Sequence, residues 1–272
     1  MLRTIQGTTL PALGIGTWEL VGDDTIPGVR AALEVGYRHI DTAQAYGNEH
    51  TVGQAITSSG IDRDDIFLTT KVWNDNITPE GIRSSTYESL SKLETDHVDL
   101  LLLHWPVNLD DLEKNLEVLG ELVEAGATRH IGVSNFTPVQ VRRALEAAPI
   151  FCVQVEHHAY LAQEEMRSLC AENDILFTAY SPLARGELLT DPAVEAIAEE
   201  RGASPAQVLL RGILDEGDHV AVIPKGTSRD HIEDNFGALQ VGLHDEDREA
   251  LAAMDQGKRI IDPPFAPEWS DA

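Results

Sequence analysis

Seven polar residues end or follow apolar, strand-like runs in this chain of 272 residues. In chain order they are Asp41, Lys71, His104, Asn135, Gln154, Tyr180 and Lys225. If the runs are parallel strands of one sheet, their carboxyl ends open onto one face and these side chains meet there. One such residue alone usually only caps a loop, but a polar group after seven runs predicts a site that performs chemistry.

Four residues form a candidate proton-transfer set. Tyr46 lies five residues after Asp41 in "DTAQAYGNE", and a phenol with a pKa near 10 is a poor acid at neutral pH. A lysine cation about 4 Å away contributes up to about 4 kcal/mol at an effective dielectric constant near 20, or about 3 pKa units. We therefore expect Lys71 to bring the pKa of Tyr46 toward neutrality, and Asp41 to keep Lys71 charged. His104 would bind the substrate oxygen or join the proton relay, and the four residues together predict general acid–base chemistry on a carbonyl or an alcohol.

The elements that must position these residues alternate along the chain. Amphipathic stretches separate the apolar runs. Several of them begin with a helix-start signal, at Asp24, Thr78-Pro79, Thr137-Pro138 and Ser204-Pro205. The predicted strands cover residues 11–18, 37–42, 66–72, 97–105, 129–135, 151–157, 175–181 and 219–225. Eight strands, each followed by a helix, predict an α/β protein with one (β/α)₈ TIM-barrel domain over residues 1–272.

Two further features bear on this architecture. An open doubly wound sheet is the alternative, but "GIGTWE" after the first strand stops short of the GxGxxG fingerprint. The segment "LRTIQGTTLPAL" predicts an N-terminal β-hairpin that turns at Gly7 and plugs one end of the barrel.

The charge balance excludes some partners. The chain has 46 Asp and Glu against 20 Lys and Arg, a formal net charge of −26, and only five lysines. Nucleic acid and anionic membranes are therefore disfavoured, and no run of eighteen apolar residues predicts a membrane span. The acids are spread along the chain, which resembles proteins of a salt-accumulating cytoplasm, where the screening length falls to roughly 3 Å at 1 M salt. We expect a halophilic protein.

The compartment is expected to be the cytoplasm. The N-terminus lacks the basic segment and long apolar run of a secretion signal. Cys152 and Cys170 show neither CxxC nor zinc-site spacing, which favours reduced thiols.

Eight motifs in order carry a family resemblance. They are "GIGTW", "DTAQAYGNE", "TKVWN", "LLLLHWP", "IGVSNF", "QVE", "AYSPL" and "IPK", and with them the chain resembles the aldo-keto reductases along nearly its whole length. The resemblance implies a barrel that binds NADP(H) in extended form and transfers hydride from nicotinamide C4 to a carbonyl carbon. It implies Tyr46 as the general acid, Asp41 and Lys71 as the residues that tune it, and His104 as the residue that orients the carbonyl.

The resemblance also implies cofactor and substrate contacts. Ser134, Asn135 and Gln154 would bind the carboxamide and Tyr180 would stack on the nicotinamide. Ser181, Leu183 and Gly186 would lie beside the pyrophosphate, and Asp234 and Asn235 would hold the adenine. Trp18, Trp73 and Trp105 would line an apolar pocket for an aldehyde, ketone or alcohol. The remaining implied cofactor contacts are Gly16, Thr17, Trp18, Ile223, Lys225, Thr227, Ser228 and His231.

The chain departs from the family pattern at the adenosine end. Relatives that prefer NADP(H) commonly carry arginine six residues after the last strand's lysine, where this chain has His231, and Gly226 replaces a hydroxyl residue. Losing a charge-assisted contact of about 1.5–3 kcal/mol weakens phosphate discrimination roughly 10- to 100-fold. We therefore expect NADP(H) to be used and NAD(H) to be tolerated, with Arg229 as a further cation that could reach the phosphate. Short segments after "HWP" and at the C-terminus predict an open substrate pocket.

Two other functions compete with a reductase. A nucleotide-binding, redox-sensing barrel is the first, although its expected sign is loss of the four proton-transfer residues. A metal-dependent hydrolase is suggested by "EHH" at 156–158, but adjacent strand residues point to opposite faces, so no metal site is expected. Many relatives are monomers, and we expect a monomer.

Overall fold

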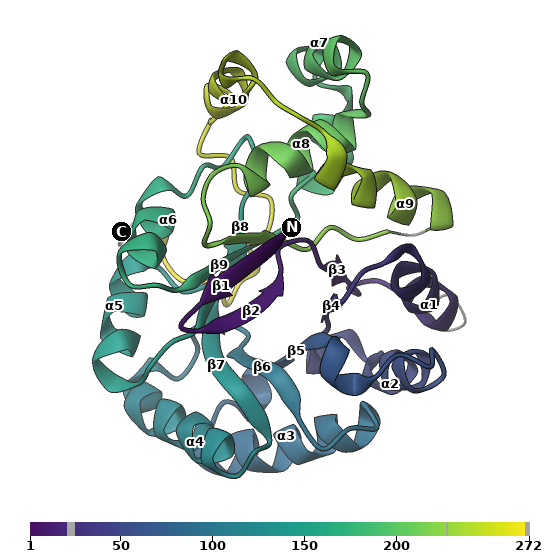
Figure 1. Ribbon diagram of the computed structural model, residues 1–272. Coiled ribbons are helices and arrows are strands. Elements are labelled where there is room, and N and C mark those ends of the chain that lie inside the picture. Colours follow the sequence, from purple (N-terminus) through teal and green to yellow (C-terminus); the bar gives the residue numbers. More distant parts are fainter. Residues whose placement is uncertain (21–24, 227, 270–272) are drawn as a thin grey trace.

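A closed barrel of parallel strands forms the centre of the computed structural model, which describes residues 1–20, 25–226 and 228–269 (Figure 1). Within these residues eight parallel strands follow one another around the sheet in chain order. They are β3 (Ile15–Gly16), β4 (His39–Asp41), β5 (Phe67–Val72), β6 (Val98–Leu103), β7 (Thr128–Ser134), β8 (Cys152–Glu156), β9 (Leu176–Tyr180) and β10 (Val220–Val222).

The barrel closes between its first and last strands. Leu13 forms a parallel bridge with Val222, whose N–H donates to the Ala12 carbonyl at 2.8 Å. Gly16 donates to the Pro224 carbonyl at 3.0 Å, and a Cβ on Gly16 would lie 3.0 Å from the Ile223 carbonyl oxygen. This close backbone approach leaves no room for a side chain. The predicted (β/α)₈ barrel is confirmed.

Helices surround the sheet (Figure 1). Thr78 caps α3 by accepting a backbone N–H, and Thr137 and Ser204 open α5 and α8 with capping boxes, as the Thr-Pro and Ser-Pro signals predict. Asp191, which the sequence analysis did not single out, caps α7 in the same way as Thr78 caps α3. The predicted start at Asp24 lies outside the described residues. The helices are α1 (Thr25–Val35), α2 (Glu49–Thr57), α3 (Pro79–Lys92), α4 (Leu112–Glu124), α5 (Pro138–Ala147), α6 (Glu164–Glu172), α7 (Pro192–Arg201), α8 (Pro205–Leu214), α9 (Arg229–Gly237) and α10 (Asp245–Ala252).

The N-terminal hairpin covers the end of the barrel at which the strands begin (Figure 1). Strands β1 (Leu2–Ile5) and β2 (Thr8–Pro11) pair antiparallel across a two-residue turn in which Gln6 and Gly7 both have positive φ. Ile5 and Leu10 pack in one apolar cluster with barrel residues such as Phe67 and Phe151. The predicted hairpin plug is therefore present.

Apolar burial drives the assembly of these layers. Every residue of β5 and of β6 is buried, as expected for strands covered on both faces. No helix within the described ranges combines the length and apolarity that a membrane span requires.

Candidate active site

The predicted proton-transfer residues meet at the carboxyl ends of neighbouring strands. Asp41 ends β4, Lys71 lies in β5, and His104 directly follows β6. Tyr46 comes from the short 3₁₀ helix η2 (Gln44–Tyr46) in the loop after β4. The structure brings all four together, because these strands are adjacent in the sheet.

Lys71 is the centre of the cluster. Its side chain is fully buried, and Nζ donates hydrogen bonds to Asp41 Oδ1, to the Thr42 carbonyl at 2.9 Å and to the Tyr46 hydroxyl at 3.3 Å. An ammonium has three donors, so these partners use all of them. Burial by itself would lower the pKa of Lys71, but Asp41 and then Tyr46 outweigh it, and the pKa is raised. Lys71 therefore stays charged.

The ionisation of Tyr46 differs from the prediction. Burial raises the pKa of Tyr46 by more than Lys71 lowers it, and the charge of Asp41 raises it further. The pKa therefore lies above 10 and not near neutrality, because the phenolate loses its solvation in this buried position. Tyr46 is a neutral phenol at pH 7 and holds the proton that a general acid must give.

His104 is a neutral imidazole. Burial, followed by the charge of Lys71, lowers its pKa well below 6.5. Its Nδ1 is buried without a hydrogen-bond partner among the described residues. A lone pair without a donor costs less than a buried N–H without an acceptor, so the proton belongs on Nε2. The ring is then a hydrogen-bond donor beside Tyr46, with the two ring centroids 5.8 Å apart.

A layer of amide and hydroxyl groups adjoins these four residues. Gln154 Nε2 donates to Asp41 Oδ2 at 2.7 Å, and Asn135 Nδ2 donates to the His104 carbonyl at 2.9 Å and to Ser134 Oγ at 3.1 Å. The Tyr180 hydroxyl donates to Asn135 Oδ1 at 2.7 Å. The predicted carboxamide and stacking residues therefore lie together, and they are linked by hydrogen bonds to the proton-transfer cluster.

The loop after β9 holds an unusual backbone. Ser181, Ala184 and Arg185 have φ values of 50°, 49° and 54°, and Gly186 has 96°. Such a run of left-handed residues is costly for non-glycine side chains and is found mainly at functional loops. Ser181, Leu183 and Gly186, the predicted pyrophosphate neighbours, lie in this loop.

The predicted adenosine end surrounds the N-terminus of α9. Ser228 caps the helix by accepting the His231 N–H at 3.2 Å, and Asn235 donates to the Lys225 carbonyl at 3.4 Å. Thr227 lies outside the described residues. Asp234 accepts hydrogen bonds from Ser204 and Gln207 at the start of α8, so its carboxylate holds that helix. Arg229 forms exposed ion pairs with Glu34 of α1 and with Glu233 of α9, so a phosphate contact by Arg229 stays a prediction.

An ion pair beside this end was missed by the sequence interpretation. Lys225 Nζ lies 2.7 Å from Glu19 Oε2, and both Lys225 and Arg185 lie over the Trp18 ring, at 5.8 Å and 4.7 Å from its centroid. Trp18 is 39% exposed. Thr17, next to it, carries a buried Oγ1 without a hydrogen-bond partner within the described parts of the chain. The contacts of Trp18 place it beside the predicted pyrophosphate path.

The aromatic pocket also contains residues that the sequence did not single out. Trp73 packs edge-on against His104 at 5.3 Å, and Phe265 packs against both Trp73 and Trp105 at 5.6 Å and 5.3 Å. Trp269 lies 6.4 Å from Trp105. The C-terminal segment thus covers two of the three predicted pocket tryptophans despite its shortness, and Phe265 and Trp269 had no signal except their aromatic type.

The two histidines of "EHH" serve separate carboxylates. His157 Nε2 lies 2.7 Å from Glu216 Oε2, whereas His158 Nε2 lies 2.9 Å from Glu156 Oε1. Because β8 ends at Glu156, both histidines lie in the segment after the strand, and strand alternation does not account for their separate partners.

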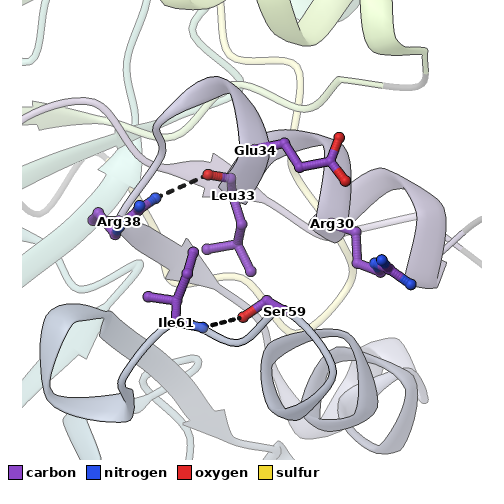
Figure 2. A pocket seen from close by; sticks show the side chains of 6 residues that line it. All are labelled: Arg30, Leu33, Glu34, Arg38, Ser59 and Ile61. Atoms are coloured by element: carbon purple, nitrogen blue, oxygen red, sulfur yellow. Dashed lines mark hydrogen bonds between the residues drawn. The ribbon is translucent and has the colours of Figure 1, made fainter.

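A cavity of about 270 Å³ lies between α1 and the segment after α2 (Figure 2). Arg38 in its wall donates to the carbonyls of Leu33 and Tyr37, and Glu34 pairs with Arg229. None of the proton-transfer residues lines it, and Arg30 and Arg38 lie on opposite sides of it in Figure 2. We therefore assign it no part in the chemistry.

Comparison with known proteins decides the family. A model of the Aldo/keto reductase family matches residues 12–256. The chain belongs to this family. It is 41% identical over 266 residues to methylglyoxal reductase DkgB of Escherichia coli O157:H7, with 96% of this chain and 99% of that protein covered. An aldo-keto reductase of Mycolicibacterium smegmatis is 39% identical, with 94% and 93% covered. A solved structure described as a candidate 2,5-diketo-D-gluconic acid reductase B superimposes with a TM-score of 0.95 at 39% identity, covering 99% and 98% of the two chains.

Membership fixes the class of reaction. This aldo/keto reductase is an oxidoreductase that reduces carbonyl compounds with a nicotinamide cofactor, as the sequence predicted. The redox-sensing barrel without turnover is not favoured, since all four proton-transfer residues are present and in contact.

Proposed function

We propose that this aldo/keto reductase reduces small α-oxoaldehydes, with methylglyoxal as the test substrate, and uses NADPH in preference to NADH. The observation that supports the proposal most directly is the hydrogen bond from Lys71 Nζ to the Tyr46 hydroxyl at 3.3 Å. It joins a charged ammonium to a neutral phenol, and the neutral imidazole of His104 lies beside that phenol. The name of the similar methylglyoxal reductase supports the choice of substrate class.

The residues present fit a nicotinamide cofactor. Tyr180 is only partly buried at the end of β9, and its hydroxyl is fixed by Asn135, which leaves a ring face for stacking. Lys225 is one-third exposed beside the N-terminus of α9, where backbone N–H groups favour a phosphate. Thr17 Oγ1, which is buried and has no hydrogen-bond partner among the residues that the structure describes, offers a further hydrogen-bonding atom beside Trp18.

The chemistry divides between the cofactor and the protein. Bound NADPH supplies a hydride to the carbonyl carbon. His104 would donate its Nε2–H to the carbonyl oxygen and orient it, and Tyr46 would transfer its proton to that oxygen as negative charge develops there. Lys71 stabilises the resulting phenolate, Asp41 compensates the charge of Lys71, and Tyr46 regains its proton from solvent. The product is the alcohol.

The remaining expectations complete the proposal. The chain would work as one domain over residues 1–272, as a monomer in the cytoplasm, and its charge of −26 would suit high salt. NAD(H) would be tolerated as a second, weaker cofactor, because His231 stands where NADP(H)-preferring relatives carry arginine and the preference for the 2′-phosphate is therefore reduced.

The direct test is consumption of NADPH and of NADH with a panel of α-oxoaldehydes, simple aldehydes, ketones and 2-keto acids at low and molar salt, with identification of the alcohol product. We expect the highest kcat/KM with methylglyoxal-type substrates and NADPH. Turnover restricted to 2-keto acids would contradict the substrate class, and no turnover with any carbonyl would contradict the whole proposal.

A further inference from the structure

A buried carboxylate on β8 holds the C-terminal segment (residues 256–269) over the barrel mouth. Glu156, at the end of β8, is 0% exposed. Its Oε1 accepts the Ile260 N–H at 2.8 Å, and its Oε2 accepts the Ile261 N–H at 2.9 Å. These two atoms join residues more than a hundred positions apart in the chain, and both hydrogen bonds have a charged acceptor, which is the stronger kind.

The surroundings keep Glu156 ionised. Burial alone would raise the pKa of Glu156, but hydrogen bonds from His158 and from the backbone of Ile261 and Ile260 outweigh it, and the pKa is lowered. Arg259 Nη1 lies 3.8 Å from Oε2 and adds a partial counter-charge. Glu156 makes no hydrogen bond to any of the four proton-transfer residues, so its carboxylate takes no direct part in the proton transfer.

The held segment carries the two aromatic residues that cover the pocket tryptophans. Phe265 follows Ile261 by four residues and packs against Trp73 and Trp105. The Arg259 guanidinium lies 3.5 Å from the Trp269 ring centroid, and Trp269 Nε1 donates to Asp262 Oδ1 at 2.9 Å. Before Arg259 the segment is attached by the N–H groups of Gln256 and Lys258, which both donate to the Tyr160 carbonyl.

The arrangement leaves Glu156 as the anchor nearest to the aromatic residues. The attachment at Tyr160 fixes the beginning of the segment, but Phe265 lies seven residues after Lys258. Without the hydrogen bonds at 260 and 261, the side chain of Phe265, already 40% exposed, would be held over the pocket by ring contacts, its own with Trp73 and Trp105 and that of Trp269 with Trp105.

We propose that Glu156 is a positioning residue for substrate binding: its carboxylate fixes the backbone at Ile260 and Ile261 and thereby places Phe265 and Trp269 over the substrate pocket. This inference rests on the proposed function for its kinetic readout. It predicts that Glu156 acts on the affinity for the carbonyl substrate and leaves the cofactor and the chemical step unaffected.

The chain offers a matched control at Glu216. Glu216 also pairs with a buried histidine, His157, which neighbours His158 in the sequence, but it makes no hydrogen bond to the C-terminal segment. Glu156→Gln and Glu216→Gln therefore make the same chemical change in neighbouring carboxylate–histidine pairs, and only the first removes the anchor.

The experiment measures steady-state kinetics, NADPH binding by fluorescence titration and amide hydrogen exchange. For Glu156→Gln we expect KM for the carbonyl to rise about tenfold, as the loss of a charge-assisted hydrogen bond implies, with kcat within about twofold and the NADPH Kd unchanged. Amide hydrogen exchange should accelerate only in peptides that cover residues 256–269. Glu216→Gln should leave the KM and the exchange of this segment unchanged.

Two further variants test the path of the effect. Ile261→Pro removes one of the two N–H donors while Glu156 stays intact, and it should also raise KM even if Glu156→Gln folds poorly. In a background of Phe265→Ala with Trp269→Ala, Glu156→Gln should cause no additional rise, because coupled residues are not additive.

Three results would overturn the inference: additive effects in that background, equal effects of the two Glu→Gln variants, or a weakened NADPH Kd in Glu156→Gln. The last would assign Glu156 to the neighbouring Tyr180 and hence to the cofactor. If the wild-type protein reduced no carbonyl, the proposed function would fail, and the exchange data would still decide whether Glu156 anchors the segment.

Discussion

Lys71 Nζ contacts the Tyr46 hydroxyl at 3.3 Å and Asp41 at the same time, inside a fully buried environment. The ammonium does not make Tyr46 acidic by itself, because burial raises the phenol's pKa by more than Lys71 lowers it. It instead provides a charge that stabilises the phenolate only when the proton leaves. This is the kind of interaction that favours a transition state over a ground state.

Replacing Tyr46 with Phe should lower kcat by about 10²–10⁴-fold, the usual contribution of a positioned general acid. The NADPH Kd should stay within about twofold, since the phenol hydroxyl is not among the proposed cofactor contacts. Steady-state kinetics and fluorescence titration check both. Tyr87→Phe, at an exposed tyrosine of α3, is the control and should match the wild type. Unchanged turnover in Tyr46→Phe would remove Tyr46 as the acid.

Replacing Lys71 with Met should lower the free energy of unfolding by about 3–5 kcal/mol, because it leaves the buried charge of Asp41 without its partner. Urea unfolding measures this. Lys92→Met breaks an exposed pair with Glu88, which solvent screens, and should leave the free energy of unfolding nearly unchanged. Equal losses in the two variants would mean that the Lys71–Asp41 pair is not a buried ion pair in solution.

Replacing His231 with Arg should raise the NADPH over NADH preference by about 10- to 100-fold, because a charge-assisted phosphate contact is worth about 1.5–3 kcal/mol. The ratio of kcat/KM values for the two cofactors is the measurement. His50→Arg makes the same change on α2 and should leave the ratio unaltered. If the wild-type protein already preferred NADPH over NADH by more than about 1,000-fold, or roughly 4 kcal/mol, His231 would not weaken the recognition of the 2′-phosphate.

The sequence predicted the elements well because their signals are local. Alternating apolar runs, Thr-Pro and Ser-Pro starts and the turn at Gly7 each depend on neighbouring residues, and the barrel then follows from the order of its elements. The strand-end rule likewise brought together Asp41, Lys71 and His104.

Features set by burial or by distant contacts could not be predicted in this way. The pKa of Tyr46 depends on a desolvation that no spacing reveals. The pairing of Asp234 with α8, and of Lys225 with Glu19, joins segments that no local pattern relates. The hydrogen bonds from Ile260 and Ile261 to Glu156, about a hundred residues earlier, likewise join segments that no local pattern relates.

Acidification below about pH 6.5 should destabilise the protein, because folding lowers the pKa of the buried His39 and of the half-buried His130. Burial lowers the pKa of His39, which contacts the Pro11 carbonyl under the hairpin, and that of His130, which pairs with Thr8. Below pH 6.5 the unfolded chain binds protons at these sites and the folded chain does not, so stability is present above 6.5 and is lost as pH falls.

The measurement is the free energy of unfolding from pH 8 to pH 5. Each buried histidine can contribute a slope of up to about 1.4 kcal/mol per pH unit. His39→Asn should show a smaller slope than the wild type, and His50→Asn, at an exposed position, the same slope. A stability independent of pH in this range would contradict neutral, buried histidines.

Salt should stabilise the fold. A net charge of −26 repels itself in the compact state, and raising KCl from 0.05 M to 1 M shortens the screening length to roughly 3 Å. The free energy of unfolding should therefore rise with KCl concentration. Sucrose of equal osmolarity is the control, because it is excluded from the protein surface but does not screen charge. The same screening should weaken NADPH binding at Lys225, so the NADPH Kd should rise as stability rises. Equal stability at 0.05 M and 1 M KCl would show that the acidic surface is no adaptation to salt.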